Sequence, residues 1–188
     1  MQDKRSRVLE VATQLFAEQG FDKTSVAHIC ELAQVSKGLV YHHFKSKDDI
    51  LVEIFSATTQ KMVEMNETKS QAPPRDQLVQ LIETLFSQLK NDKLFYQLNL
   101  NLMFQPGTRA LLDSQIKERA ALLFGSVKSI FDQIDPVQSN KLSFIFIAEV
   151  DGVALDYLSV FEEYPLDEIK DHLIQKYQNF SPLNSKKS

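Results

Sequence analysis

Two short apolar helical patterns, separated by a break at residues 34–36, lie between Ser25 and Phe44. The first pattern has the i, i+3, i+4, i+7 spacing of one helix face, at Val26, Ile29, Cys30 and Ala33. In the second, Val40 and Phe44 lie four residues apart, and the Ser36 hydroxyl can cap the helix by accepting a hydrogen bond from a first-turn N–H. Two helices joined by so short a turn are typical of the helix-turn-helix unit, whose second helix enters the major groove of DNA.

The second of these helices, and the segment that follows it, are basic. Between Glu31 and Asp48 the sequence contains no acidic residue. The side chains in this stretch that carry or can take up positive charge are Lys37, His42, His43, Lys45 and Lys47. The formal net charge of the chain, −4, argues against non-specific coating of nucleic acid but not against a local contact. The pattern therefore predicts a DNA-reading unit.

Many positions in and around this unit form one recognisable signature. They are Ala12, Leu15, Phe16, Gly20-Phe21, Thr24-Ser25-Val26, Ile29, Ala33, Val35-Ser36-Lys37-Gly38, Tyr41-His42-His43-Phe44 and Lys47-Asp48-Asp49-Ile50-Leu51. The signature covers about the first fifty-five residues and resembles the amino-terminal domain of TetR-type transcriptional regulators. The chain departs from it at Gln34, where the turn usually has glycine, which takes a left-handed backbone at no steric cost. We expect Gln34 to bear that conformation with some strain, or the turn to differ slightly.

The resemblance implies roles for individual side chains. The phosphate anchors would be Tyr41, Lys47 and Thr24, and the residues facing the groove would be Lys37, Gly38, Leu39 and His42 or His43. This agrees in kind with the chemistry, because lysine and tyrosine bind phosphate oxygens and leucine can contact a thymine methyl group. The predicted surface also includes Ser36 and either Thr24 or Ser25, which would cap the two helices near a phosphate. Solvated surface remains the alternative for the two histidines and for the basic residues at positions 4–7.

Helical patterns continue beyond residue 46, with proline and glycine at the breaks. We expect helices at 3–19, 47–66, 75–91, 93–105, 108–134, 137–161 and 166–177, in addition to the two of the helix-turn-helix unit. The predicted fold is all-α with about nine helices, which the resemblance also implies. We expect a DNA-binding domain at 1–46 and a helical effector-binding and dimerisation domain at 47–188, with 47–66 as the connecting helix.

Length and composition place the chain among ordinary globular proteins. Its 188 residues are 43% apolar and 10% aromatic, enough for a DNA-binding unit and a larger core. The single cysteine cannot form an internal disulfide, which fits the reducing cytoplasm. The N-terminus lacks the apolar run of a secretion signal, and no stretch approaches about eighteen uncharged apolar residues. We therefore expect a cytoplasmic protein without a membrane-spanning segment.

The helices after Pro74 are rich in phenylalanine. Each such residue is more often core than pocket, but the resemblance implies a cavity for a small hydrophobic effector among the middle helices. On this basis the predicted ligand-binding residues are Phe86, Phe95, Tyr96, Asn99, Leu102, Met103, Phe124 and Phe131. Tyr96 and Asn99, with Asn101 nearby, would supply the few polar groups of such a pocket.

The predicted helix at 137–161 is apolar nearly all round, which indicates burial on more than one side. Together with 166–177 it resembles the helix pair through which the family dimerises. The predicted dimerisation residues are Phe146, Val150, Val153, Leu158 and Leu173. Three acids in the same helix could face a cationic ligand, the dimer partner or solvent: Glu149, Asp151 and Asp156. Dimerisation is also favoured on physical grounds, because two recognition helices related by a two-fold axis can bind the two halves of a palindrome.

Catalysis has little support in this sequence. It contains no Gly-rich phosphate loop, Cys-x-x-Cys or His-Glu-x-x-His pattern, and its two close His–Glu pairs, at 28/31 and 168/172, are isolated. We expect no catalytic site, metal or cofactor. The predicted function is a homodimeric repressor, released from operator DNA by a small hydrophobic effector. The alternatives are an activator or ligand-independent regulator, and, in another class, a helical small-molecule binder or enzyme indifferent to DNA.

Overall fold

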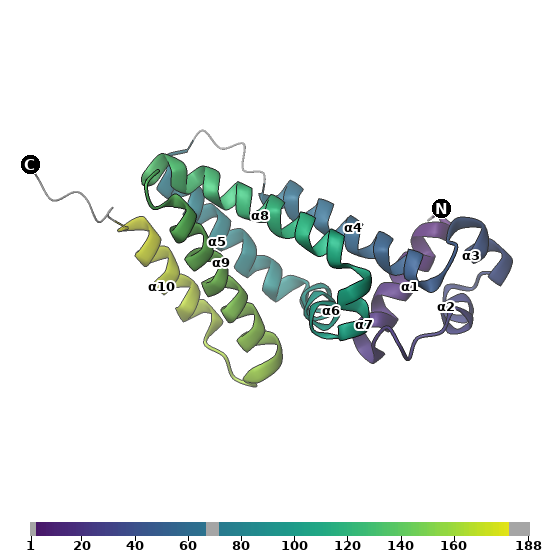
Figure 1. Cartoon of the computed structure of the whole chain (residues 1–188). Helices are drawn as coiled ribbons and strands as arrows, with labels where there is room; N and C mark the ends of the chain where they lie inside the picture. The colour runs from purple at the N-terminus through teal and green to yellow at the C-terminus, as the bar shows by residue number, and fades with distance from the viewer. Residues whose placement is uncertain (1–2, 67–71, 181–188) are drawn as a thin grey trace, which may run out of the picture. The chain divides into compact units, whose positions relative to one another are not determined.

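The computed structural model describes residues 3–66 and 72–180, and within those ranges it contains helices but no strand. The elements are α1 (Lys4–Gln19), α2 (Val26–Ala33), α3 (Lys37–His43), α4 (Lys47–Asn66), α5 (Pro74–Asn91), α6 (Lys93–Phe104), α7 (Pro106–Leu111), α8 (Asp113–Ile134), α9 (Ser139–Leu155), the π-helical turn η1 (Asp156–Val160) and α10 (Leu166–Gln178) (Figure 1). The prediction of an all-α fold is confirmed.

Two of the predicted helices differ from the observed ones. The predicted helix at 108–134 is two helices, α7 and α8, because the backbone at Leu112 turns to φ −99° and ψ 11° between them. Pro106 is the first residue of α7, a position where its missing N–H leaves no hydrogen bond unmade. The predicted helix at 137–161 is α9 followed by η1, so the last turn is wider than an α-helical turn.

Residues 1–61 and 94–118 form one compact unit, which contains α1 to α3, most of α4, and α6 and α7. Its core combines α1 residues such as Phe16 with Val40 and Phe44 of the predicted DNA-reading region. The core also takes in residues from much later in the sequence: Leu98, Leu102, Leu112 and Ile116. The unit therefore extends well beyond the predicted DNA-binding domain at 1–46.

Residues 62–93 and 119–188 form the second compact unit, in which α5 and α10 pack along one another. Leu78, Ile82 and Phe86 of α5 are buried. The rings of Phe131, Phe146 and Tyr177 form a cluster with centroids 5.1 to 6.2 Å apart in edge-to-face geometry. Such contacts add to the free energy gained by burying the rings, so this cluster ties α8, α9 and α10 together.

None of the helices in the described ranges has the length and sustained apolar character that a bilayer span requires.

Candidate nucleic-acid interface

Serine caps fix the starts of both helices in the helix-turn-helix unit. The Ser25 hydroxyl accepts a hydrogen bond from the backbone N–H of His28 at 3.1 Å. The Ser36 hydroxyl accepts one from the N–H of Leu39 at 3.2 Å. Each bond satisfies a donor that the first turn of a helix leaves unpaired. The cap predicted at Ser36 is confirmed, and of the two residues considered for α2, Ser25 is the cap.

The turn between α2 and α3 depends on Gln34. This residue takes the left-handed conformation, φ 56° and ψ 45°. Its N–H donates to the carbonyl of Glu31 at 3.2 Å, and the N–H of Val35 donates to the carbonyl of Cys30 at 3.0 Å. These two bonds are the Schellman pattern that normally ends a helix at glycine. The first of the two expectations is therefore confirmed: Gln34 bears the left-handed backbone.

α3 has one buried side and one exposed side. Val40 is buried and Phe44, just past the helix end, is buried as well, as predicted. Tyr41 keeps 55% of its surface exposed, and Leu39 is half-buried. The other exposed residues of the helix are Lys37, Gly38, His42 and His43. The exposed side thus presents an ammonium group, a phenol and two imidazoles, all able to donate hydrogen bonds to phosphate oxygens or base edges.

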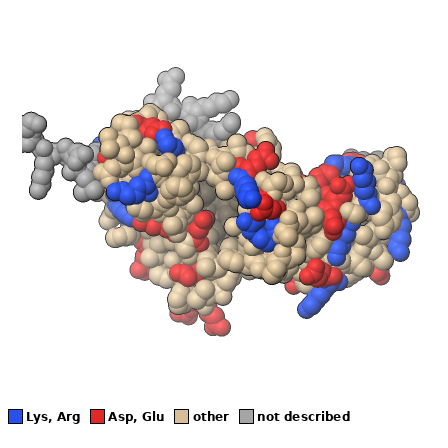
Figure 2. Space-filling view, viewed as in Figure 1, with Lys and Arg blue, Asp and Glu red and all other residues tan. Residues whose placement is uncertain are grey.

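Basic side chains of α1 have partners within the protein. Arg5 forms an ion pair with Glu53 of α4, and its guanidinium lies 5.4 Å from the centroid of the Phe44 ring. Arg7 pairs with Glu10 at 2.8 Å. In Figure 2, Lys and Arg side chains are interspersed with Asp and Glu over the end of the chain that carries α1 to α3. Two of the three basic residues at positions 4–7 are therefore engaged in ion pairs.

Two of the predicted phosphate anchors point into the protein. Thr24 is 2% exposed, and its hydroxyl donates to the carbonyl of Gly20 at 2.9 Å. The ammonium nitrogen of Lys47 donates to the carbonyls of Phe21 at 2.8 Å and of Thr24 at 3.0 Å. The prediction that the Thr24 hydroxyl meets a phosphate needs correction, because burial and an internal bond commit it to the turn between α1 and α2.

The predicted ligand-binding residues are divided between the two compact units. Five belong to the first unit: Phe95, Tyr96, Asn99, Leu102 and Met103. Leu102 lies in that unit's core, and the Asn99 amide donates to the carbonyl of Phe95 at 2.7 Å, one turn earlier in α6. The other three are Phe86, Phe124 and Phe131, in the second unit. Phe86 and Phe131 are fully buried within the second unit, which agrees with the core interpretation, and their predicted ligand role stays a prediction.

Phe124 has a neighbour that the sequence did not indicate. Its ring centroid lies 4.5 Å from that of Phe144 of α9, and Phe144 itself is 60% exposed. Met103 in the first unit is also exposed. These side chains lie at the surface of their units.

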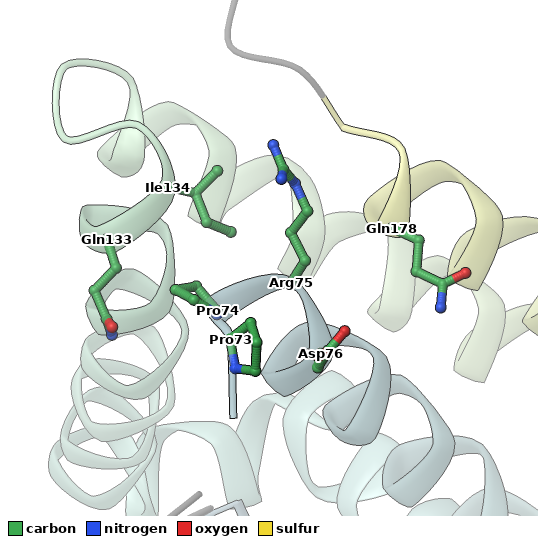
Figure 3. Close-up of a pocket in the computed structure, with 7 residues that line it drawn as sticks. All are labelled: Pro73, Pro74, Arg75, Asp76, Gln133, Ile134 and Gln178. Carbon is green, nitrogen blue, oxygen red and sulfur yellow. The ribbon is translucent and has the colours of Figure 1, made fainter. Parts of the chain in front are cut away.

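One pocket of about 390 Å³ in the second unit was not predicted. It is lined by Pro73, Pro74, Arg75, Asp76, Gln133, Ile134 and Gln178 (Figure 3). These residues come from the start of α5, the end of α8 and the end of α10. In the sequence they are only helix-end residues, and nothing there indicates that three helix ends meet. Most of the lining is polar, unlike the predicted apolar cavity.

The predicted dimerisation residues are mostly interior. Phe146, Val153 and Leu173 are buried within the second unit, and Val150 and Leu158 are half-buried. Burial of Phe146, Val153 and Leu173 shows that they pack within their own chain, and their predicted role in a subunit contact stays a prediction. The large apolar residues that α9 exposes are instead Phe144 and Ile145.

Glu149 has a role inside the second unit. Its carboxylate accepts a hydrogen bond from the Tyr177 hydroxyl at 2.9 Å and pairs with Lys176, both on α10. Burial, together with the nearby Glu149 charge, raises the pKa of Tyr177 above its ordinary value. The carboxylate of Glu149 thus holds α9 against α10, whereas Asp151 is exposed and Asp156 half-buried.

Comparison with known proteins links the N-terminal part of the chain to one family. Residues 8–54 match the model of the bacterial regulatory proteins, tetR family. Over 90 residues the chain is 34% identical to the HTH-type transcriptional regulator AcrR of Shigella flexneri, a match that covers 48% of this chain and 42% of that regulator. The match thus spans less than half of the relative's length.

Solved structures resemble the chain along nearly its full length. A transcriptional regulator from Aquifex aeolicus VF5 is 26% identical, with a TM-score of 0.71 over 92% of this chain and 96% of that one. FadR from Bacillus subtilis, solved in complex with stearoyl-CoA, has a TM-score of 0.75 over 93% and 97% of the two chains at 20% identity. At that identity the second likeness establishes the fold alone.

Proposed function

We propose that this chain, whose N-terminal domain belongs to the TetR family, is a homodimeric DNA-binding repressor that a small hydrophobic molecule releases from its operator. The observation that carries the proposal is the exposed side of α3. Ser36 caps the helix and Val40 and Phe44 anchor it, so Lys37, Tyr41 and the imidazoles face outward together. A short rigid helix with hydrogen-bond donors on one side is what major-groove recognition requires.

The contacts divide by chemistry. Lys37, His42 and His43 would donate to base edges, Gly38 lets the backbone approach, and Leu39 would touch a thymine methyl group. Tyr41, exposed and carrying a phenol, would bind a phosphate oxygen. The capped N-terminus of α2 at Ser25 would bind another, since unpaired N–H groups and the helix dipole attract anions there.

Dimerisation would use the exposed side of α9 together with α10. Phe144 and Ile145 are large apolar residues that the chain leaves in contact with solvent. A second copy related by a two-fold axis would cover them and place two copies of α3 on a palindrome. The half-buried Val150 and Leu158 would lie at the edge of that contact.

The effector would be a small, largely apolar molecule. The FadR likeness supports an apolar group in the ligand, because that protein was solved with stearoyl-CoA, whose acyl chain is apolar. Release would be a population shift, in which the ligand binds more tightly to dimers whose two α3 helices are wrongly spaced for DNA. The ligand would then lower the affinity for DNA by the same factor by which DNA lowers the affinity for the ligand. α4 is the candidate link, because its residues 47–61 belong to one compact unit and its remaining turn to the other.

Selection of bound duplexes from a random DNA library tests the proposal. The purified protein should enrich a palindrome whose half-sites are about one helical turn, or a multiple of it, apart. A reporter promoter carrying that sequence should be repressed, and activation instead would reverse the sign of regulation. If no sequence is enriched at low salt, with or without candidate effectors, the chain is a DNA-independent helical binder and the proposal fails.

A further inference from the structure

In the described part of the chain, one side of α9 is left uncovered. The exposed residues on that side recur every three or four positions and form a stripe: Asn140, Lys141, Phe144, Ile145, Ala148, Asp151 and Gly152. At 3.6 residues per turn these positions share one side of the helix, and the buried Phe146 and Val153 lie on the opposite side. The stripe carries a cation near its start and an anion near its end, with apolar residues between them.

The two charged residues of the stripe have no ion-pair partner among the described residues. Neither Lys141 nor Asp151 takes part in a salt bridge there. Ten residues of α-helix separate the two by about 15 Å, so they cannot pair with each other within one copy. Partial desolvation raises the pKa of the Asp151 carboxyl, and the sequence contains no basic residue between Lys141 and Lys170. Each charge can therefore accept a counter-charge from a second molecule.

A two-fold axis would bring the two ends of the stripe together. In an antiparallel pair of identical helices, a residue before the axis lies opposite the residue equally far beyond it on the other copy. With the axis level with residue 146, Lys141 lies opposite Asp151, and Phe144 lies opposite Ala148. The axis also exchanges the two sides of the stripe's midline, and at 100° per residue the members of each pair do lie on opposite sides of it. Both pairs are complementary, a cation with an anion and a large ring with a methyl group.

Two further observations agree with this pairing. The Phe144 ring is 60% exposed and rests against Phe124, so its own chain holds the ring on one side and leaves the other side open. A Cβ added at Gly152 would meet no atom within 4 Å, so packing inside the described chain does not require glycine there, although glycine is unfavourable inside a helix. The same axis places Gly152 opposite Asn140 of the second copy, where the missing side chain leaves room for the amide.

We propose that α9 packs antiparallel against α9 of a second copy, with the two-fold axis level with residue 146, so that Lys141 of each copy forms an ion pair with Asp151 of the other. The inference rests on the proposed homodimer and specifies its register. The two ion pairs lie about 15 Å apart, on either side of the axis. Complementary charges across an interface fix register more than they add affinity. Here they favour the antiparallel arrangement over a parallel one, in which Lys141 would face Lys141.

Charge reversal tests the ion pairs. Lys141→Glu or Asp151→Lys alone should raise the dimer dissociation constant by about a hundredfold or more, because each places like charges opposite one another twice per dimer. Lys23→Glu makes the same change of net charge at an exposed position in the first compact unit, and should change the constant by less than about threefold, because distant surface charges are screened. Sedimentation equilibrium measures the constants, and circular dichroism checks that each variant stays helical. Single reversals that dimerise like the wild type would overturn the proposal.

Rescue identifies the partner of each charge. The double variant Lys141→Glu/Asp151→Lys has opposite charges at both contacts again, so its dissociation constant should return to within about tenfold of the wild-type value. A mixture of the two single variants should form heterodimers, because both contacts between unlike copies then join an acid to a lysine. Native mass spectrometry with one variant isotopically labelled detects them. Rescue within one copy is excluded by the separation of the two residues along α9. A double variant that dimerises no better than the single variants would overturn the register.

The wild type separates failure of the register from failure of the proposed function. If the wild type dimerises but neither the double variant nor the mixture recovers, α9 pairs in another way, and the proposed homodimeric repressor stands without this register. If the wild type stays monomeric at every accessible concentration, the proposed dimer fails, and the register fails with it.

Discussion

Two helix pairs in this chain are built differently. α2 and α3 meet across a turn closed by cap and backbone hydrogen bonds, and they bury modest side chains such as Cys30 and Val40 while polar groups stay outside. α9 and α10 are joined by large rings, with Phe146 and Tyr177 5.1 Å apart, and by the Glu149 carboxylate. The first pair leaves donors exposed, and the second leaves Phe144 exposed. What each pair leaves outside supports the partner proposed for it: DNA for the first pair and a second copy of the chain for the other.

The largest effect should come from the ring cluster that distinguishes the second pair. Phe146→Ala should lower the free energy of unfolding by about 3–5 kcal/mol, because it removes a buried ring and leaves a cavity. Denaturant unfolding at fixed protein concentration measures this, with Phe146→Leu as the volume-conserving control. A loss of less than about 1 kcal/mol would mean that Phe146 is not a core residue of its own subunit, and would favour the dimer contact first predicted for it.

Phe144 should behave in the opposite way, although it is the same residue type two positions earlier. Phe144→Ala should leave the unfolding free energy of the isolated subunit nearly unchanged and raise the dimer dissociation constant by about tenfold to a hundredfold. Sedimentation equilibrium measures the constant, and Val137→Ala provides an exposed apolar control in the turn before α9. An unchanged dissociation constant would remove α9 from the proposed dimer contact.

The contrast between Phe144 and Phe146 also shows where prediction from sequence fails. Both lie on a helix that is apolar nearly all round, so periodicity alone cannot tell the face that meets α8 and α10 from the face left outside. The sequence also could not predict the hydrogen-bond partners of Lys47 and Thr24. These partners are backbone carbonyls, and the packing of α4 on the corner after α1 determines which of them lie within reach. The cap at Ser36 was predictable because donor and acceptor lie three residues apart in the chain.

Most helix boundaries were predictable for that local reason, since capping residues and prolines act within one turn. The break at Leu112 was missed because no proline or glycine marks it. The pocket at the start of α5 was missed because it requires three distant helix ends to meet. The fold class and the reading helix therefore followed from the sequence, whereas the partners of individual buried side chains did not.

The cap at Ser36 should contribute a smaller but measurable amount to the first pair. Ser36→Ala should cost about 1 kcal/mol of unfolding free energy, because the N–H of Leu39 loses its partner at the start of α3. Ser56→Ala, an exposed serine in the middle of α4, is the matched control and should be neutral or slightly stabilising. If both substitutions had the same effect, the cap would not be what fixes the start of the reading helix.

The smallest expected effect is a gain at Gln34, the position where the turn departs from the signature that the N-terminal part of the chain otherwise resembles. A left-handed backbone costs a residue with a Cβ about 1–2 kcal/mol relative to glycine, and the greater freedom of glycine in the unfolded chain offsets part of that. Gln34→Gly should therefore raise the unfolding free energy by about 0.5–1 kcal/mol, whereas Gln34→Ala, which keeps the Cβ, should not. Thermal unfolding of the three proteins side by side measures the difference. A loss of stability in Gln34→Gly would mean that the glutamine side chain contributes a bond worth more than the strain, and the turn between α2 and α3 would then be stabilised by side-chain contacts, as the α9–α10 pair is.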